Sequence, residues 1–181
     1  MRIVGGRFRG RRLIAPRDQS IRPTSDRARE ALFNMLEHGE PPVRGAHFLD
    51  LFAGTGAVGL EACSRGAAEV VLVENAPAAL ALIQANLAAL GRPAGVRPMA
   101  VDATRLGPAP GRFDIVFIDP PYGSGLASPA LGALGRGWLA EDARVVVEFA
   151  VREDLDLPAG YEIERDRRYG AARLVVLRAQ A

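Results

Sequence analysis

Four consecutive residues, Asp119, Pro120, Pro121 and Tyr122, combine a carboxylate, a rigid turn and an aromatic ring. They follow the apolar run 113–118, which is typical of a buried strand, and the two prolines must end that strand. Open α/β sheets bind ligands at the carboxyl ends of their strands, so we expect these groups to lie in a binding site. A flat ligand with an amine, such as a nucleobase, would suit these groups. The acid and a backbone carbonyl that is not bonded to a neighbouring strand can accept the amine's hydrogens, and the aromatic ring can stack on the ligand. An ordinary turn with a surface tyrosine is the alternative that the tetrad alone leaves open.

A glycine-rich turn lies upstream of this tetrad, between an expected strand over 46–52 and an expected helix. The segment 54–59 reads Gly-Thr-Gly-Ala-Val-Gly, and this context is what makes a G-x-G-x-x-G match meaningful. Gly54 and Gly56 would let the backbone approach a ligand, and Gly59 would let the helix pack closely on the strand. The next apolar strand, 70–73, ends in Glu74. An acid about 20 residues after the glycines can accept both hydroxyls of a ribose.

Two ligands fit such a turn with its acidic partner, namely a dinucleotide and S-adenosylmethionine. Asp50 lies four residues before the first glycine, where its charge would repel a pyrophosphate but would attract the methionyl ammonium. A third expected strand, 96–101, is followed by Asp102 and Ala103. The Asp102 carboxylate can accept an adenine amine, and the next backbone N–H can serve a ring nitrogen. These residues favour S-adenosylmethionine over a nicotinamide dinucleotide, so a dehydrogenase becomes the less favoured enzyme class.

Together, the motifs at 50–56, Glu74, Asp102 and 119–122 resemble those of the class I methyltransferases, and the tetrad resembles the version that methylates exocyclic amines of nucleobases. The segments 2–11, 22–27 and 30–34 resemble bacterial 16S ribosomal RNA guanine-N2 methyltransferases of the RsmD type. The resemblance covers essentially the whole chain. It implies a Rossmann-like class I fold in which a seven-stranded, mostly parallel α/β sheet has an antiparallel last strand, with a short N-terminal β-hairpin and helix.

The resemblance also implies a reaction, the transfer of a methyl group from S-adenosylmethionine to a guanine N2 amine in small-subunit rRNA. Asp119 and the Pro120 carbonyl would each accept one N–H of that amine and direct its lone pair at the methyl group, while Pro121 stiffens the turn and Tyr122 stacks on the base. The base would have to be extruded from RNA structure to reach them. The expected cofactor residues are Asp50, Phe52, Gly54, Gly56, Glu74, Asp102, Ala103 and Asp119, and the expected catalytic residues are Asp119, Pro120 and Tyr122.

Basic residues are concentrated at the N-terminal end. The net charge is +2, but residues 1–29 carry +7 and the remainder carries −5. Arginine forks suit bidentate phosphate contacts and stacking on bases, although a solvated basic tail is the plainer alternative. We predict that residues 1–40 form an RNA-binding extension of a single domain, 1–181, whose catalytic core spans 45–181. The expected substrate-binding residues are Arg7, Arg9, Arg11, Arg12, Arg22, Arg27, Pro121 and Tyr122.

The composition of the chain indicates what kind of protein it is. The 181 residues are 49% hydrophobic, which is enough for one domain with a substantial core. There is no long apolar stretch and no signal-peptide pattern, so we expect a soluble cytoplasmic protein. Cys63 is the single cysteine and is expected to be a packed residue. His38 and His47 lack partners at ligand spacing, so no metal is predicted.

Three function classes remain on these grounds. A 16S rRNA guanine-N2 methyltransferase is favoured. A DNA adenine N6 or other amine methyltransferase is the alternative, because the same tetrad serves those enzymes. A nucleotide-binding or RNA-binding module without catalysis is third. The expected elements are a hairpin over 2–14, helices over 26–37, 77–90 and within 128–135, a strand over 145–149, and an antiparallel pair over 161–168 and 174–177.

Overall fold

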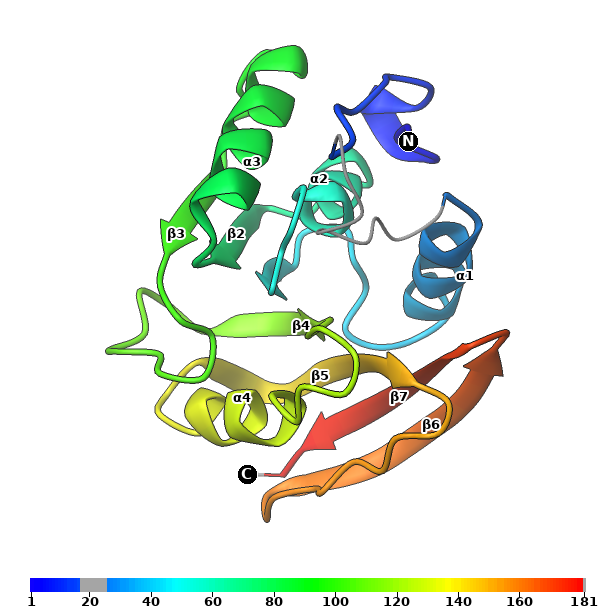
Figure 1. Ribbon diagram of the computed structural model, residues 1–181, viewed down its shortest axis with the longest axis vertical. Coiled ribbons are helices and arrows are strands. Elements are labelled where there is room, and N and C mark those ends of the chain that lie inside the picture. The colour runs from blue at the N-terminus through cyan, green and yellow to red at the C-terminus, as the bar shows by residue number, and fades with distance from the viewer. Residues whose placement is uncertain (17–25, 181) are drawn as a thin grey trace.

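The computed structural model describes residues 1–16 and 26–180, and within them one mixed sheet of seven strands forms the centre of the molecule (Figure 1). The order of the strands across the sheet is β3-β2-β1-β4-β5-β7-β6. The strands are β1 (His47–Leu51), β2 (Glu69–Glu74), β3 (Val96–Ala100), β4 (Phe113–Ile118), β5 (Leu139–Ala150), β6 (Tyr161–Tyr169) and β7 (Ala172–Ala179). The helices between and before them are η1 (Gly6–Phe8), α1 (Asp26–Glu37), α2 (Ala57–Ser64), α3 (Pro77–Ala89) and α4 (Ala127–Leu134).

Strands β1 to β5 run parallel, and β7 pairs antiparallel with both β5 and β6. The predicted mostly parallel sheet with an antiparallel last strand is therefore confirmed. The chain first builds outward through β2 and β3 and then returns to place β4 on the other side of β1. This reversal makes the carboxyl ends of β1 and β4 a topological switch point, which is where open α/β sheets bind ligands.

Two layers of apolar side chains cover the two faces of the sheet. Helices α1, α2 and α3 pack on one face, where Phe48, Leu72 and Phe117 are buried. Helix α4 packs on the opposite face, where Val116 and Val147 are buried. Figure 1 shows α4 on the other side of β4 and β5 from α1 and α2. Because parallel strands are buried on both faces, their sequences are continuous apolar runs, which is why they were predictable.

The N-terminal segment folds back on itself as expected, although its turn is helical. Arg2 bridges Arg12 in antiparallel fashion, and the Ile3 amide donates to the Arg11 carbonyl at 2.9 Å. The turn between them contains η1. Ile3 and Leu13 are buried in the same core cluster as Phe48, so this segment packs on the side of the sheet that α1, α2 and α3 cover.

Helix α1 has the predicted bounds, and its buried face includes one charged residue. The helical spacing predicts an apolar face of Ala28, Ala31, Leu32, Met35 and Leu36. The last three are buried together with Arg29 and Phe33, whereas the two alanines are half-buried. Arg29 is tolerated there because its guanidinium donates to the Arg2 carbonyl and to Asp26 Oδ1. Thr24 and Ser25, whose hydroxyls are typical N-caps for a helix that begins at Asp26, lie outside the described residues. Over the described ranges no helix is long and apolar enough to cross a membrane.

Candidate active site

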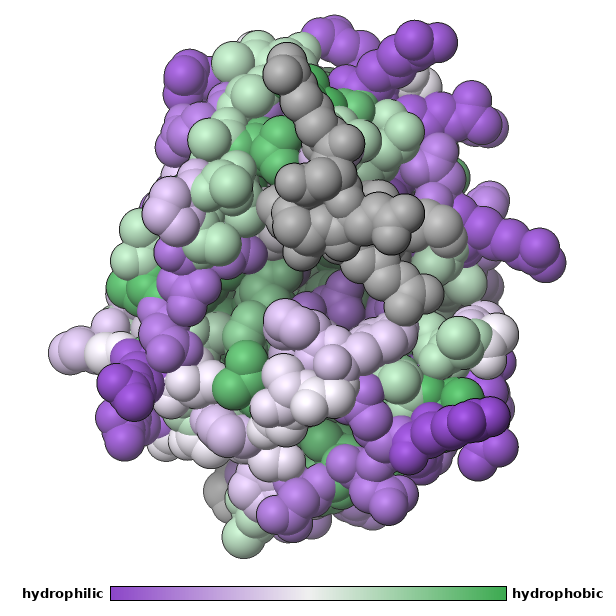
Figure 2. Space-filling model, viewed as in Figure 1, coloured by the Kyte–Doolittle hydropathy of each residue, from purple (hydrophilic) through white to green (hydrophobic). Residues whose placement is uncertain are grey.

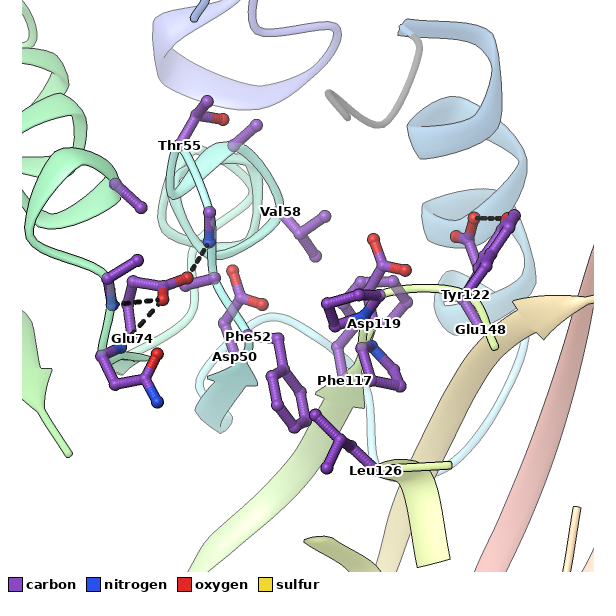
Figure 3. Close-up of a pocket in the computed structure, with 18 of the residues that line it drawn as sticks. Asp50, Phe52, Thr55, Val58, Glu74, Phe117, Asp119, Tyr122, Leu126 and Glu148 are labelled. Carbon is purple, nitrogen blue, oxygen red and sulfur yellow. Dashed lines mark hydrogen bonds between the residues drawn. The ribbon is translucent and has the colours of Figure 1, made fainter. Parts of the chain in front are cut away.

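A cavity of about 780 Å³ opens at the switch point, along the carboxyl ends of β1, β2, β4 and β5 (Figure 3). Its volume lies within the usual range for small-molecule sites. Of the predicted cofactor residues, six line it, namely Asp50, Phe52, Gly54, Glu74, Asp102 and Asp119. Of the predicted substrate residues, Pro121 and Tyr122 line it. Residues from four motifs that are far apart in the sequence thus surround one space.

The glycine turn has the backbone that its sequence requires. Gly54 and Gly56 have φ angles of 55° and 77°, a region that side chains disfavour. A Cβ atom on Gly59 would lie 2.2 Å from Leu72 Cδ2, so only glycine lets α2 approach β2 this closely. Gly56 does not line the cavity, because its Cβ position faces the core at 3.2 Å from Leu72. Its role is to shape the turn that begins α2.

Asp50 is a buried carboxylate at the end of β1, with 2% of its surface exposed. The Gly59 amide donates to its Oδ2 at 2.9 Å, which orients the side chain beside the turn. Burial raises the pKa of Asp50 to about 7; the Gly59 hydrogen bond opposes this rise, and the negative charge of Glu74 adds to it. A buried acid without a cationic partner among the described residues is costly, and a positively charged ligand would relieve that cost.

Glu74 is held at the end of β2 by three backbone amides. Its Oε2 accepts from Gly54 at 2.9 Å, and its Oε1 accepts from Asn75 and Ala76 at 2.8 and 2.9 Å. These bonds tie the glycine turn to the start of α3 and aim the carboxylate into the cavity (Figure 3). A carboxylate has about four acceptor positions, so hydroxyl groups of a ligand can still bind.

Asp102 follows β3 and forms the outer end of the cavity. Hydrogen bonds from the Thr104 hydroxyl at 2.7 Å and the Thr104 amide at 2.8 Å hold the pKa of Asp102 below its usual value. This carboxylate can accept an amine. Ala103, in contrast, is buried in the core under α4's face of the sheet and does not line the cavity.

The tetrad lies where β4 ends, between the glycine turn and β5. The Asp119 amide bonds the Leu51 carbonyl at 3.4 Å, which fixes the start of the turn against β1. Asp119 is half-buried, Pro120 is buried and Pro121 is exposed at the rim. In Figure 3, Asp119 lies between the Asp50–Glu74 side of the cavity and Tyr122. An amine placed here would meet both a carboxylate and the aromatic ring.

Several residues of the cavity were missed by the sequence analysis. Glu148, on β5, accepts a hydrogen bond from the Tyr122 hydroxyl at 3.1 Å. Ala28, Tyr169, Ala171 and Ala172 line the cavity from α1 and the β6–β7 turn. The apolar run 145–149 indicated only a buried strand, so nothing in it marked Glu148 as a site residue.

The predicted arginines that the structure describes lie outside the cavity, and their environments differ. Arg7 is tucked against Phe8 and Cys63, and Arg11 donates to the Ala89 carbonyl at 2.6 Å. Arg9 and Arg12 are exposed and their side chains make no hydrogen bond or ion pair within the described residues, and Arg27 is also exposed. Figure 2 shows hydrophilic side chains projecting at the upper right, where Figure 1 places the N-terminal segment. Arg22 lies outside the described residues.

The predicted packing of Cys63 is confirmed, since it is buried in α2. In residues 1–16 and 26–180 no three His, Cys, Asp or Glu side chains are placed to hold a metal ion.

Comparisons with known proteins agree with this architecture. Residues 1–178 match the model of the family described as Conserved hypothetical protein 95. The chain is 40% identical to the Ribosomal RNA small subunit methyltransferase D of Escherichia coli (strain K12), over 99% of this chain and 91% of that protein. It is 31% identical to the protein of the same name from Haemophilus influenzae, over 94% and 89% of the two chains.

Among solved structures, the yhhF protein of Escherichia coli superposes with a TM-score of 0.85 at 38% identity, covering 100% of this chain and 98% of that one. The Rossmann-like methyltransferase fold expected from the motifs is thereby confirmed. The family match over nearly the whole chain and the identity to the curated relatives lead to one conclusion: the chain belongs to the Conserved hypothetical protein 95 family, together with the bacterial small-subunit rRNA methyltransferases D.

Proposed function

We propose that this protein methylates the exocyclic N2 amine of a guanine in 16S rRNA, with S-adenosylmethionine as the methyl donor, in the cytoplasm. The observation that carries the proposal is the position of Asp119 to Tyr122. In a member of a family of rRNA methyltransferases, the tetrad lies in the same cavity as Asp50, Glu74 and Asp102. Its family makes the chain an rRNA methyltransferase. The proposal adds which base and which atom receive the methyl group, and which residues contact the cofactor.

The cavity fits S-adenosylmethionine by its donor and acceptor groups. Asp50 would neutralise the methionyl ammonium, Glu74 would accept the ribose hydroxyls, and Asp102 would accept the adenine amine. Phe52 and Gly54 would line the path between them. When bound, the cofactor supplies an electrophilic methyl group on a sulfonium. The raised pKa of Asp50 fits this role, because a buried acid gains most from a cationic ligand.

The protein's own contribution to the reaction is to bind and orient the amine. The lone pair of a guanine N2 amine is delocalised into the ring, which makes the amine a poor nucleophile. Asp119 and the Pro120 carbonyl would accept its two N–H groups, withdraw the lone pair from conjugation and stabilise the positive charge that develops on nitrogen. The Tyr122 ring would stack on the base. The exposed arginines of the N-terminal segment, Arg9 and Arg12, would contact phosphates.

Methyl transfer to small ribosomal subunits tests the proposal directly. Subunits from cells that lack this protein are incubated with labelled S-adenosylmethionine, and the RNA is digested to nucleosides. We expect label in N2-methylguanosine, with Asp119→Asn lowering the rate by about 100-fold or more at saturating S-adenosylmethionine. Label in adenine, or in DNA offered as a competitor, would show that the alternative amine methyltransferase activity is the correct one. The exposed Glu162→Gln serves as the matched control.

A further inference from the structure

Glu148 lies beside Asp119 on the neighbouring strand. Ile118, the last residue of β4, pairs with Val147 of β5 in parallel register, and Asp119 and Glu148 are the residues that follow them in the chain. Adjacent strands are about 4.8 Å apart, and residues in register point to the same face of a sheet. Glu148 has the same parity along β5 as Val146, which is buried on the face that α1 covers. The sheet therefore presents two neighbouring carboxylates at its carboxyl edge.

The same cavity contains both carboxylates, and Tyr122 connects them. Glu148 is half-buried and lines the cavity together with Asp119. The Tyr122 hydroxyl donates to Glu148 Oε1 at 3.1 Å, so the residue expected to stack on the base also orients this carboxylate. Figure 3 shows the Tyr122–Glu148 pair on the opposite side of Asp119 from Glu74. Glu148 is thus in the part of the cavity away from the cofactor residues.

A guanine and an adenine present different groups next to the reacting amine. Guanine has an N1–H donor beside its N2 amine, whereas adenine has a bare N1 acceptor beside its N6 amine. An ionised carboxylate accepts hydrogen bonds, donates none, and has about four acceptor positions. A base whose amine is held at Asp119 and whose N1 edge faces β5 would place N1 beside Glu148. Guanine would then donate its N1–H to the Glu148 carboxylate. Adenine would instead place the lone pair of its N1 against the carboxylate, which is unfavourable.

We propose that Glu148 accepts the N1–H of the target base and makes the site selective for guanine over adenine. The proposal rests on the function proposed above and names the residue that determines which nucleobase the site accepts. The tetrad is shared with adenine methyltransferases and does not itself choose between bases. Enzymes that extrude a base read it through its Watson–Crick edge, and a site built to receive a donor rejects a base that lacks one.

The test compares two bases at the methylated position, once that position has been mapped with wild-type protein. Small subunits are reconstituted with 16S rRNA that carries either guanine or 2-aminopurine there. 2-Aminopurine keeps the amine at C2 but has an acceptor at N1 in place of N1–H. We expect wild-type kcat/KM to favour guanine by about 10- to 100-fold, as for a hydrogen bond to a charged group. In Glu148→Gln the ratio should fall about tenfold, because the side-chain amide can donate to N1.

Controls separate this role from a structural one. Glu162→Gln makes the same change on the exposed edge strand β6 and should keep the wild-type ratio. Glu148→Asp keeps the charge but withdraws the carboxylate by one methylene, so its ratio should fall severalfold, and it replaces the glutamine variant if that one does not fold. Melting curves and S-adenosylmethionine titrations identify a folded variant.

The two proposals fail in different ways. If wild-type protein forms no N2-methylguanosine in any subunit, the proposed function is wrong. If it does, and a folded Glu148 variant has the wild-type ratio of guanine to 2-aminopurine rates, the assignment of base selectivity to Glu148 is overturned while the proposed function stands.

Discussion

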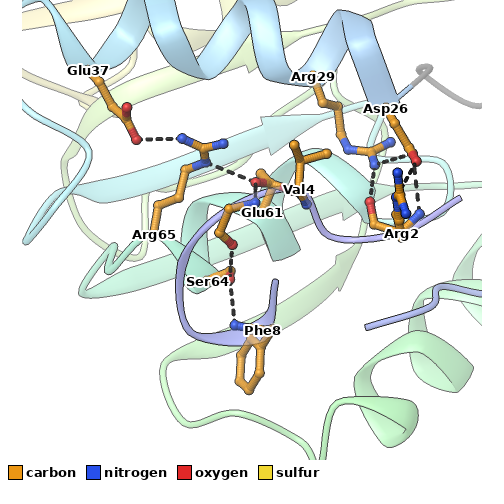
Figure 4. A network of polar contacts seen from close by, with 10 residues as sticks. Arg2, Val4, Phe8, Asp26, Arg29, Glu37, Glu61, Ser64 and Arg65 are labelled. Carbon is orange, nitrogen blue, oxygen red and sulfur yellow. Dashed lines mark hydrogen bonds and ion pairs between the residues drawn. The ribbon is translucent and has the colours of Figure 1, made fainter. Parts of the chain in front are cut away.

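Glu61 connects the N-terminal segment to the cofactor side of the fold, and its replacement by glutamine is our most quantitative prediction. Glu61 is fully buried in α2. Its two oxygens accept from the Val4 amide at 2.8 Å and the Gly5 amide at 2.7 Å. Arg65 adds a third bond through Nε at 2.9 Å and also binds Glu37 at 2.5 Å (Figure 4). One buried carboxylate therefore holds residues that lie 56 and 57 positions away.

The cost of Glu61→Gln follows from this geometry. The amide is nearly isosteric, so no cavity forms, but its NH2 group would face one of the two backbone N–H donors. An unsatisfied donor costs about 1–3 kcal/mol, and the remaining bonds lose the strengthening that a charged acceptor provides. The total is about 3 kcal/mol. That is a large part of the ~5–15 kcal/mol by which a domain of ordinary stability is folded.

Amide hydrogen exchange and urea unfolding measure this effect. We expect faster exchange at Val4 and Gly5 and a free energy of unfolding lower by about 3 kcal/mol. rRNA methylation should fall more than S-adenosylmethionine affinity, because the arginines of the N-terminal segment would lose their position. Glu162→Gln, on an exposed strand, should change stability by less than about 0.5 kcal/mol. Unchanged exchange at Val4 and Gly5 in Glu61→Gln would refute the assigned role of this network.

Three further predictions concern the cofactor turn and the basic segment. Affinity for S-adenosylmethionine should rise roughly tenfold from pH 5.5 to 7, because a cationic ligand binds the ionised form of Asp50, whose pKa is about 7. Calorimetric titration measures this affinity, and for Asp50→Asn it should not change with pH over the same range. Replacing both Arg9 and Arg12 by glutamine should weaken rRNA binding and lower the slope of log K against log salt by about 1.5, measured by filter binding. Asn86→Asp should lower stability by about 2–4 kcal/mol in urea, since buried Asn86 donates to the Thr55 and Ile14 carbonyls at 2.9 and 3.2 Å.

Each of these predictions has its own control. An Asp50→Asn protein that keeps the wild-type pH profile would assign the titration to another group. Arg136→Gln, an exposed change in the turn before β5, should leave the salt slope unaltered, and an unaltered slope in the Arg9 and Arg12 variant would remove those residues from the RNA interface. Gln84→Glu changes the exposed side of the same helix as Asn86 and should be nearly neutral. Equal stability of the two α3 variants would show that the Asn86 bonds carry no net free energy.

The same pKa shift has a consequence for stability. A folded-state pKa near 7 exceeds the ordinary value for an aspartate, so the folded protein retains a proton that the unfolded chain releases near pH 4. The contribution of Asp50 to stability is therefore greatest below about pH 4 and declines as the pH rises to about 7. A bound cation would counteract this decline by stabilising the carboxylate.

Local patterns were enough to predict most of the elements. Helix α1 has its predicted bounds, and the α3 helix begins at Pro77 and ends one residue before the prediction. The strand 113–118 is also as predicted. These predictions were correct because apolar runs, prolines and glycines determine the local backbone through residues that are neighbours in the sequence. The burial of Arg29 in α1 could not be predicted from the helix alone, because it depends on the Arg2 carbonyl, which belongs to another segment.

Three of the missed features depend on contacts between segments that are distant in the sequence. The pairing of β4 with β5 shifts between Phe113 and Ile115, and no tight turn links these parallel strands. The register that sets Glu148 beside Asp119 therefore could not be read from either strand. Asn86 likewise joins α3 to the glycine turn, and Glu61 was visible only as an acid in an otherwise apolar helix.

The amino-acid sequence by itself thus determined the strand and helix pattern, the glycine turn, and the carboxylates and tetrad that identify the chemistry, because each is a property of neighbouring residues. Tertiary structure alone decided which distant groups come together: Glu148 on the strand beside Asp119, Asn86 on the Thr55 carbonyl, and the N-terminal amides on Glu61. Those contacts arise from sheet register and helix packing, where residues far apart in the chain are brought together by burial of the two apolar faces.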